Sequence, residues 1–135
     1  MNDPVALNVS YKAAENHDFD MLITAVQDIS YKDPDHDLET IQSRVKAAGQ
    51  SWLPRSVEDT VLLHHVDGPA VHGYYFSLTD KTTPLPAGEF KHITQGMALS
   101  GNLLIVFTIS TNDGQAPMVE QGLGIIASAR FRGLK

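Results

Sequence analysis

The pattern of apolar and polar residues first predicts two strands in the N-terminal third of the chain. Apolar residues alternate with small polar ones along Val5–Tyr11, and a second apolar segment follows at Met21–Ile29. Alternation with a period of two is typical of a strand that is buried on one side. The polar segment between them, residues 12–20, is expected to be the connection.

A long helix is predicted to begin at Asp33-Pro34 and to end before Pro54. Aspartate is favoured as the capping residue of a helix, and proline is favoured at the first helical position. Apolar residues then recur at spacings of three and four: Leu38, Ile41, Val45, Ala48 and Trp52. This spacing predicts one buried stripe that continues past Gly49, with Trp52 as a core anchor at the end of the helix.

Four further strands are predicted to form two hairpins. The strand segments are Val57–Val66, Val71–Thr79, Glu89–Leu99 and Leu103–Thr111. The turns between paired segments, Asp67-Gly68-Pro69 and Ser100-Gly101-Asn102, contain the residue types that favour tight turns. Leu103–Phe107 is apolar at every position, which is typical of a strand that is central in a sheet or covered on both faces.

A second helix is predicted to start at Pro117. Its apolar residues form one stripe with a neighbouring row beside it: Met118, Gly122, Ile125 and Ala129, then Val119, Leu123 and Ile126. Gly122 and Gly124 each weaken an isolated helix by about 1 kcal/mol, so we expect both to be points of close packing on the sheet.

The order of these elements predicts the fold class. Two strands, a helix, four strands and a helix follow one another, with no internal repeat and no long interior linker. Residues 1–135 are therefore expected to form a single α+β domain, an antiparallel sheet with two helices packed on it.

Composition then narrows the classes of function. The 135 residues include 10 Lys and Arg against 16 Asp and Glu, which gives a net charge of −6 and argues against a nucleic-acid partner. The chain has no cysteine, so thiolate chemistry and cysteine-based metal sites are excluded. The longest apolar run is far shorter than the roughly 20 residues of a membrane span. No signal peptide precedes Asn2-Asp3-Pro4, and the compartment is left unknown.

Two motif matches lack the context that their chemistry needs. Gly122–Ala127 reads G-x-G-x-x-A, but a dinucleotide site needs a preceding strand and a later acidic residue. Asp33, Asp35 and Asp37 have the opening spacing of a calcium loop, yet Arg44 stands where that loop requires glutamate. We identify no catalytic or cofactor-binding residue, and we do not expect an enzyme.

Histidines gather around the first predicted turn, with His64 and His65 before it and His72 after it. A two- or four-residue loop would pair His65 with His72, and a three-residue loop would pair His64 with His72. Either register places two imidazoles opposite each other, with Cβ atoms about 5 Å apart. Such a pair could hold zinc, nickel or copper, with Asp67 or His92 as a guessed third ligand. A pair that only packs or faces solvent is the alternative.

Tyr74, Tyr75 and Phe76 are consecutive, so they cannot all face the same side of a strand. At least one ring is expected on the opposite face from the others. It packs in the core if a helix covers that face, and it can anchor a partner if none does.

Several segments together resemble a known family. They are Trp52-Leu53-Pro54 with Val57-Glu58, then Gly73–Asp80, Phe90–Gly96 and Phe107–Gly114. The set is similar to small bacterial proteins of unknown function with a PsbP/Mog1-like α/β/α fold, over about Leu38–Arg130. The resemblance implies an antiparallel sheet between helices and an accessory or partner-binding module, often exported, but no specific partner.

The sequence thus predicts a non-catalytic module that binds a protein partner through a sheet face or rim. The alternative is a protein that binds a divalent metal through the histidine pair. A small hydrolase with His92 or His72 as base ranks last, because no nucleophile supports it.

Overall fold

The computed structural model describes residues 6–12, 19–27, 34–86, 89–101 and 103–128. Its elements follow the predicted order: β1 (Ala6–Lys12), β2 (Phe19–Gln27), α1 (Pro34–Trp52), the 3-10 turn η1 (Leu53–Arg55), β3 (His64–Asp67), β4 (His72–Thr79), β5 (His92–Ser100), β6 (Leu103–Thr111) and α2 (Ala116–Ala127). The predicted α+β class, an antiparallel sheet with two helices, is confirmed. The predicted helix cap, Asp33, lies outside the described residues.

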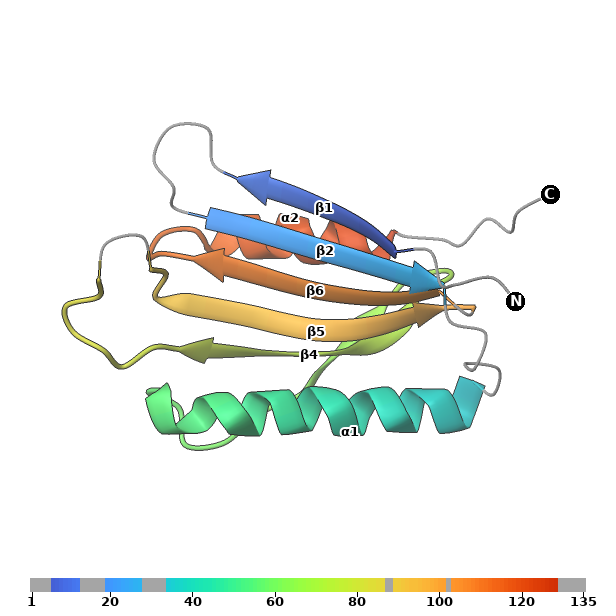
Figure 1. The fold of residues 1–135 in the computed structure, drawn as a ribbon, viewed down its shortest axis with the longest axis horizontal. Helices are drawn as coiled ribbons and strands as arrows, with labels where there is room; N and C mark the ends of the chain where they lie inside the picture. Colours follow the sequence, from blue (N-terminus) through green and yellow to red (C-terminus); the bar gives the residue numbers. More distant parts are fainter. Residues whose placement is uncertain (1–5, 13–18, 28–33, 87–88, 102, 129–135) are drawn as a thin grey trace.

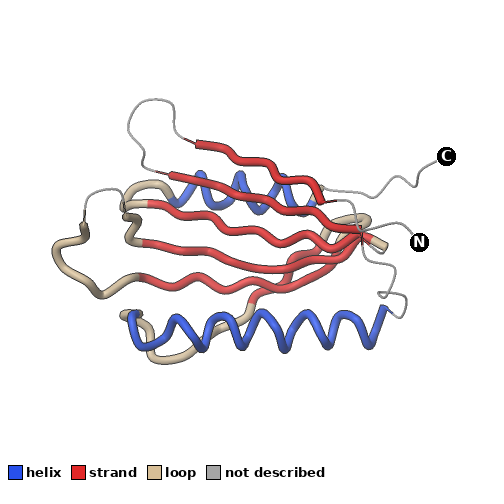
Figure 2. Tube along the Cα trace, viewed as in Figure 1, coloured by secondary structure: helices blue, strands red, loops and turns tan. Residues whose placement is uncertain are grey.

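The strands form one antiparallel sheet with the order β1-β2-β6-β5-β4-β3 (Figure 2). The strand β6 lies between β2 and β5, so the apolar run at its start belongs to a central strand, as predicted. Its residues nevertheless alternate between buried and half-buried, because only one face of β6 is fully covered.

The two helices pack on opposite faces of the sheet. Phe76 pairs with Gln95 and Gln95 with Thr108, so these side chains share one face, whereas the neighbouring Ile109 points to the other. The buried clusters are Ile41, Val45, Phe76, Leu78 and Leu99 under α1, and Met21, Val66, Val71, Ala98, Ile105, Phe107, Ile109 and Ile126 under α2. Figure 1 shows α2 behind the sheet and α1 along the β4 side.

The helix α1 runs through Gly49 to Trp52, as the apolar spacing predicted. Ile41 and Val45 are fully buried, and the other members of the stripe are partly buried. A Cβ atom at Gly49 would lie 2.7 Å from the Val61 Cγ1 atom. Glycine therefore allows α1 to approach the chain beneath it closely.

The helix α2 is rotated relative to the predicted stripe. Gly122 and Ile126 are buried, whereas Ile125, which shares the predicted stripe with Gly122, is 45% exposed. The neighbouring row of apolar residues faces the sheet instead, because Val119 and Leu123 pack against the core there. Ala129 lies outside the described residues.

The two glycines of α2 have different environments. A Cβ atom at Gly122 would lie 2.8 Å from Ile109 Cδ1 and 3.1 Å from the Met21 sulfur, which confirms Gly122 as a packing point. Nothing lies within 4 Å of a Cβ atom at Gly124, so the same prediction for Gly124 is wrong. Both residues lie well inside the helix and not at a strand-to-helix turn, which is where a dinucleotide motif would need them.

The strand β3 is shorter than the predicted Val57–Val66. Ser56 forms an isolated bridge with Asp80, and His64 pairs with Tyr75. Eight positions separate Ser56 from His64, but only five separate their partners. The surplus residues cannot pair and loop away from β4, so the prediction of one continuous strand is wrong.

Candidate functional site

The histidine hairpin has a different register from both predicted ones. His64 pairs with Tyr75, His65 with Tyr74, and His72 with Asp67. The loop spans residues 68–71 and is closed by a hydrogen bond from the Gly68 N–H to the Val71 carbonyl, 2.9 Å long. The predicted opposition of His72 to His64 or His65 is therefore wrong.

Each histidine of the hairpin lies beside a tyrosine or an aspartate and not beside a second histidine from the opposite strand. The rings of His64 and Tyr75 stack with centroids 5.1 Å apart, and those of His65 and Tyr74 lie 4.8 Å apart. The exposed His72 Nδ1 lies 3.4 Å from Asp67 Oδ1.

The metal-ligand set predicted from this hairpin is not assembled by the described residues. His92 pairs with Thr79 at the far end of β4 from His72, so it does not complete a ligand set there. Within the described part of the chain, no three His, Cys, Asp or Glu side chains form a group that could hold a metal. A metal site at His64, His65 and His72 stays a prediction.

The aromatic residues of β4 divide between the two faces, as predicted. Phe76 is fully buried in the cluster under α1, and Tyr74 lies on the same face. Tyr75 points to the other face and packs against the cluster under α2.

A network of polar side chains lies at the end of the sheet where β4 ends. One Glu58 oxygen, Oε1, accepts hydrogen bonds from Ser56 Oγ (2.6 Å) and the Thr79 N–H (2.7 Å), and Oε2 accepts one from Thr79 Oγ1 (2.9 Å). Burial raises the pKa of Glu58, but these hydrogen bonds outweigh it and leave the pKa below its ordinary value. Glu58 therefore joins the segment after η1 to the end of β4.

The network continues through His92 to the turn between β6 and α2. His92 Nδ1 lies 3.3 Å from Thr79 Oγ1, and His92 Nε2 lies 2.7 Å from Asp113 Oδ1. The Lys91 ammonium donates to Asp113 Oδ2 over 3.2 Å. Hydrogen bonds from His92 and Lys91 lower the pKa of Asp113. Four segments of the chain are thus connected across one end of the sheet.

The Thr79 hydroxyl, the His92 imidazole and the Asp113 carboxylate follow one another in the order of a hydrolytic triad. In such a triad the hydroxyl proton passes to the imidazole. The Thr79 hydroxyl instead donates its one proton to Glu58. The arrangement is that of a structural network, and it does not supply the nucleophile that the hydrolase hypothesis lacked.

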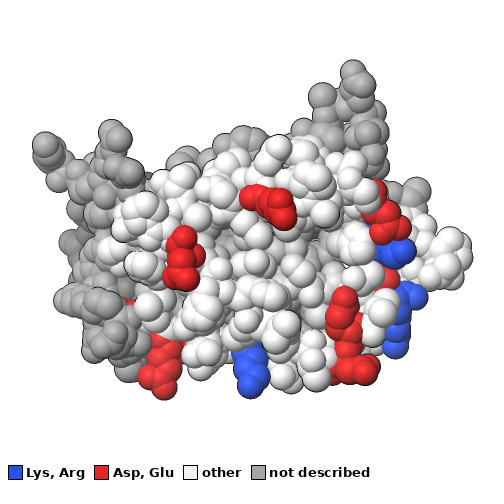
Figure 3. Space-filling view, turned by 180° about the vertical axis from the view of Figure 1, so that it is seen from behind, with Lys and Arg blue, Asp and Glu red and all other residues white. Residues whose placement is uncertain are grey.

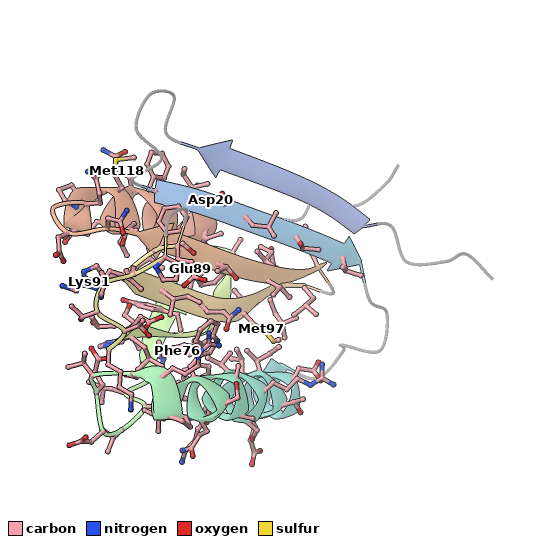
Figure 4. All side chains as sticks on the ribbon, turned by 60° about the vertical axis from the view of Figure 1, so that its left-hand side comes forward. Asp20, Phe76, Glu89, Lys91, Met97 and Met118 are labelled. Atoms are coloured by element: carbon pink, nitrogen blue, oxygen red, sulfur yellow. The ribbon has the colours of Figure 1, made fainter. Side chains whose placement is uncertain are left out.

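A cavity of about 300 Å³ opens beside this network. It is lined by Trp52, Arg55, Ser56, Leu78, Thr79, Asp80, Glu89, Phe90, Lys91, His92, Ile93 and Ser110. Figure 4 brings this end forward and shows Glu89 and Lys91, in that projection, between the two helices. Figure 3 shows acidic and basic side chains close together at one edge of the molecule.

On the sheet face that carries α1, no helix among the described elements covers the half that is formed by β2 and β6 (Figure 1). The helix α1 packs on β4 and β5, and it does not extend over β2 and β6. We call this surface the open face and define it by residues of β2, β5 and β6: Leu22, Thr24, Gln95, Val106 and Thr108. Leu22 is 47% exposed, and the other four are half-buried.

No family model matches this chain, and neither a curated protein nor a solved structure shows significant similarity to it. None of the described helices combines the length and apolarity needed to cross a bilayer.

The sequence did not identify the polar network or the open face. The network depends on the register that places Thr79 directly opposite His92, and no local signal in the sequence fixes that register. Asn112-Asp113-Gly114 has the residue types of a turn, and Gly114 does adopt a positive φ of 87°. Asp113 in addition carries the ion pairs with Lys91 and His92.

Proposed function

We propose that this protein is a non-catalytic binding module that holds a partner protein against the open face of its sheet. The observation that carries the proposal is the exposure of Leu22 near the middle of β2, on a face that α1 covers only in part. Covering this apolar side chain with a partner surface would remove it from water, which is favourable.

The chemistry of the open face indicates the kind of surface that it binds. Its five side chains are apolar or carry a hydroxyl or an amide, and the charged Asp20 lies on the same face near the start of β2. The Gln95 Nε2 atom donates to Thr108 Oγ1 over 3.2 Å, so part of the polar capacity is already satisfied within the face. Interface centres are depleted in charged residues, so a partner with an apolar, uncharged patch is the complement.

The resemblance to PsbP/Mog1-like bacterial proteins supports the same proposal, since it implies an accessory module with helices around an antiparallel sheet. We keep that family assignment as part of the proposal. The divalent-metal alternative is kept as a prediction, and a titration of labelled protein with zinc that leaves the signals of His64, His65 and His72 unmoved would end it.

Site-specific photo-crosslinking in the cells that make the protein tests the proposal. A photoreactive residue replaces Leu22 in one variant and Leu62 in the control. Leu62 is 68% exposed and belongs to the loop between η1 and β3, outside the open face. We expect one defined protein to be linked at position 22 and not at position 62. The purified partner should then lose binding to Leu22→Lys and keep binding to Leu62→Lys.

Equal crosslinking at the two positions would contradict the proposal, because exposure alone would explain it. A crosslink only between two copies of this chain would also contradict it, since the open face would then join identical subunits. Circular dichroism of Leu22→Lys establishes that any loss of binding comes from the surface and not from unfolding.

A further inference from the structure

We infer that the cavity at the β4–β5 end of the sheet binds a small organic monocarboxylate with an aromatic or aliphatic body. The inference does not depend on the open face and concerns a different kind of ligand. It rests on the lining of the cavity, on the position of one guanidinium group, and on the charges at the rim.

The floor and walls of the cavity suit an apolar ligand body. Leu78, Ile93 and Ser110 are consecutive cross-strand partners, so they lie in a row on one face of β4, β5 and β6. Trp52, at the end of α1, and Phe90 add aromatic surface. Sites for small molecules are mostly apolar with a few polar groups, and about 300 Å³ is the lower end of their usual size.

Arg55 supplies the group that would hold a carboxylate. Its guanidinium carbon lies 5.1 Å from the centroid of the Trp52 ring, which orients the side chain at the cavity. Among the ion pairs between described residues, none involves Arg55, whereas Lys91 and His92 both bind Asp113. A guanidinium stacked on an aromatic ring keeps N–H donors available for a bidentate carboxylate.

The acidic residues of the lining limit the charge of the ligand. Asp80 accepts a hydrogen bond from the Thr82 N–H over 2.8 Å, and this bond together with the nearby charge of Arg55 lowers the pKa of the Asp80 carboxyl. Glu89 is a second, exposed carboxylate of the lining. One negative charge on a ligand can bind the Arg55 guanidinium. A second charge has no further cation in the lining to bind, because Lys91 and His92 both bind Asp113, and it adds to the repulsion from Asp80 and Glu89. The lining therefore favours a monoanion over a phosphate ester.

Trp52 is the one tryptophan of the chain, so its fluorescence reports directly on the cavity. The test titrates the full chain with phenylacetate, phenyl phosphate and phenethylamine at neutral pH, followed by Trp52 emission and by ¹H–¹⁵N NMR. We expect saturable binding of phenylacetate, phenyl phosphate at least about tenfold weaker, and no saturation with phenethylamine. A tenfold change corresponds to about 1.4 kcal/mol.

Two variants locate the binding. Arg55→Gln should weaken phenylacetate at least about tenfold in the NMR titration, because a charged hydrogen-bonding partner is lost. Lys46→Gln, an exposed charge on α1, is the matched control and should bind as the wild type does. Glu89→Gln should strengthen phenyl phosphate severalfold and leave phenylacetate nearly unchanged.

The inference is overturned if phenylacetate gives no saturable response up to roughly 10 mM, where binding is too weak to be specific. It is also overturned if Arg55→Gln, shown to be folded by circular dichroism, binds phenylacetate like the wild type. If Arg55→Gln does not fold, equal affinity of Glu89→Gln and wild type for phenyl phosphate overturns the proposed selection by charge. Leu22→Lys should bind phenylacetate as the wild type does, because the cavity and the open face are different sites. Weaker binding by this variant would contradict that independence.

Discussion

Met21 and Leu22 are neighbours on β2 and have similar apolar side chains, yet their environments are opposite. Met21 is 3% exposed and lies under α2, where the absent side chain of Gly122 leaves room for its sulfur. Leu22 points to the other face and is 47% exposed, because α1 lies over β4 and β5. Apolarity alone therefore does not place a residue in the core; the helix above it does.

The largest loss of stability should come from the face of β2 that α2 covers. Met21→Ala removes a buried side chain from the cluster under α2, and such truncations cost about 2–5 kcal/mol of unfolding free energy. Urea unfolding followed by circular dichroism measures the loss. A cost below about 1 kcal/mol would mean that α2 packs loosely over β2.

The fit of α2 on the sheet gives the next largest effect. Gly122→Leu introduces atoms where Ile109 and Met21 already lie, and overpacking of this kind costs about 1–3 kcal/mol. Gly124→Ala is the control on the same helix, and it should stabilise the protein by about 0.5–1 kcal/mol, because alanine favours a helix and the space is open. Thermal unfolding of both variants decides the matter. Equal destabilisation by both would contradict the rotation of α2 that the structure shows.

The polar network at the sheet end should give a smaller effect that depends on pH. The folded pKa of Glu58 lies below its ordinary value of 4.5, so its contribution is complete above that value and is lost as the pH falls through the lowered pKa. Glu58→Gln should cost about 1 kcal/mol of unfolding free energy at pH 7, since the carboxylate is only partly buried. The variant should also lose less stability than the wild type when the pH falls below 4.5.

Urea unfolding at pH 7, 5, 4 and 3 compares Glu58→Gln with Glu120→Gln, which removes an equal charge from an exposed position on α2. Glu120→Gln should keep the acid slope of the wild type. If the unfolding free energy falls equally with pH in both variants, the hydrogen bonds from Ser56 and Thr79 do not stabilise the Glu58 carboxylate in solution.

The smallest effect should come from Leu22→Ala, the open counterpart of Met21→Ala. Only part of this side chain is removed from water in the free protein, so we expect a cost below about 1 kcal/mol. The same urea experiment measures it. A cost equal to that of Met21→Ala would contradict the open face, because Leu22 would then be covered in solution.

Much of the fold was predictable because its signals are local. The spacing from Leu38 to Trp52 and the following Pro54 predicted α1 to its last residue. The rotation of α2 was not predictable in the same way. Its apolar residues form two adjacent stripes, and the choice between them depends on Ile109 and Met21, which belong to distant strands.

The candidate sites were less predictable than the fold. The histidine hairpin depends on the register of two strands, and the open face depends on which strands a helix covers. The turn composition of Asp67-Gly68-Pro69 was consistent with several loop lengths, and the one that forms places His72 opposite Asp67. The exposure of Leu22 depends on where α1 crosses the sheet, and nothing within β2 itself encodes that position.

The pairing of β2 with β6 also determines how the chain assembles. Every other pairing in the sheet joins strands that follow one another in sequence, whereas this one brings Gln27 beside Leu103 across the whole middle of the chain. Closing so long a loop costs chain entropy that local hairpins avoid, and such contacts slow folding. We therefore expect the ribbon β3 to β6 to form first and to serve as the template on which the β1–β2 hairpin docks late.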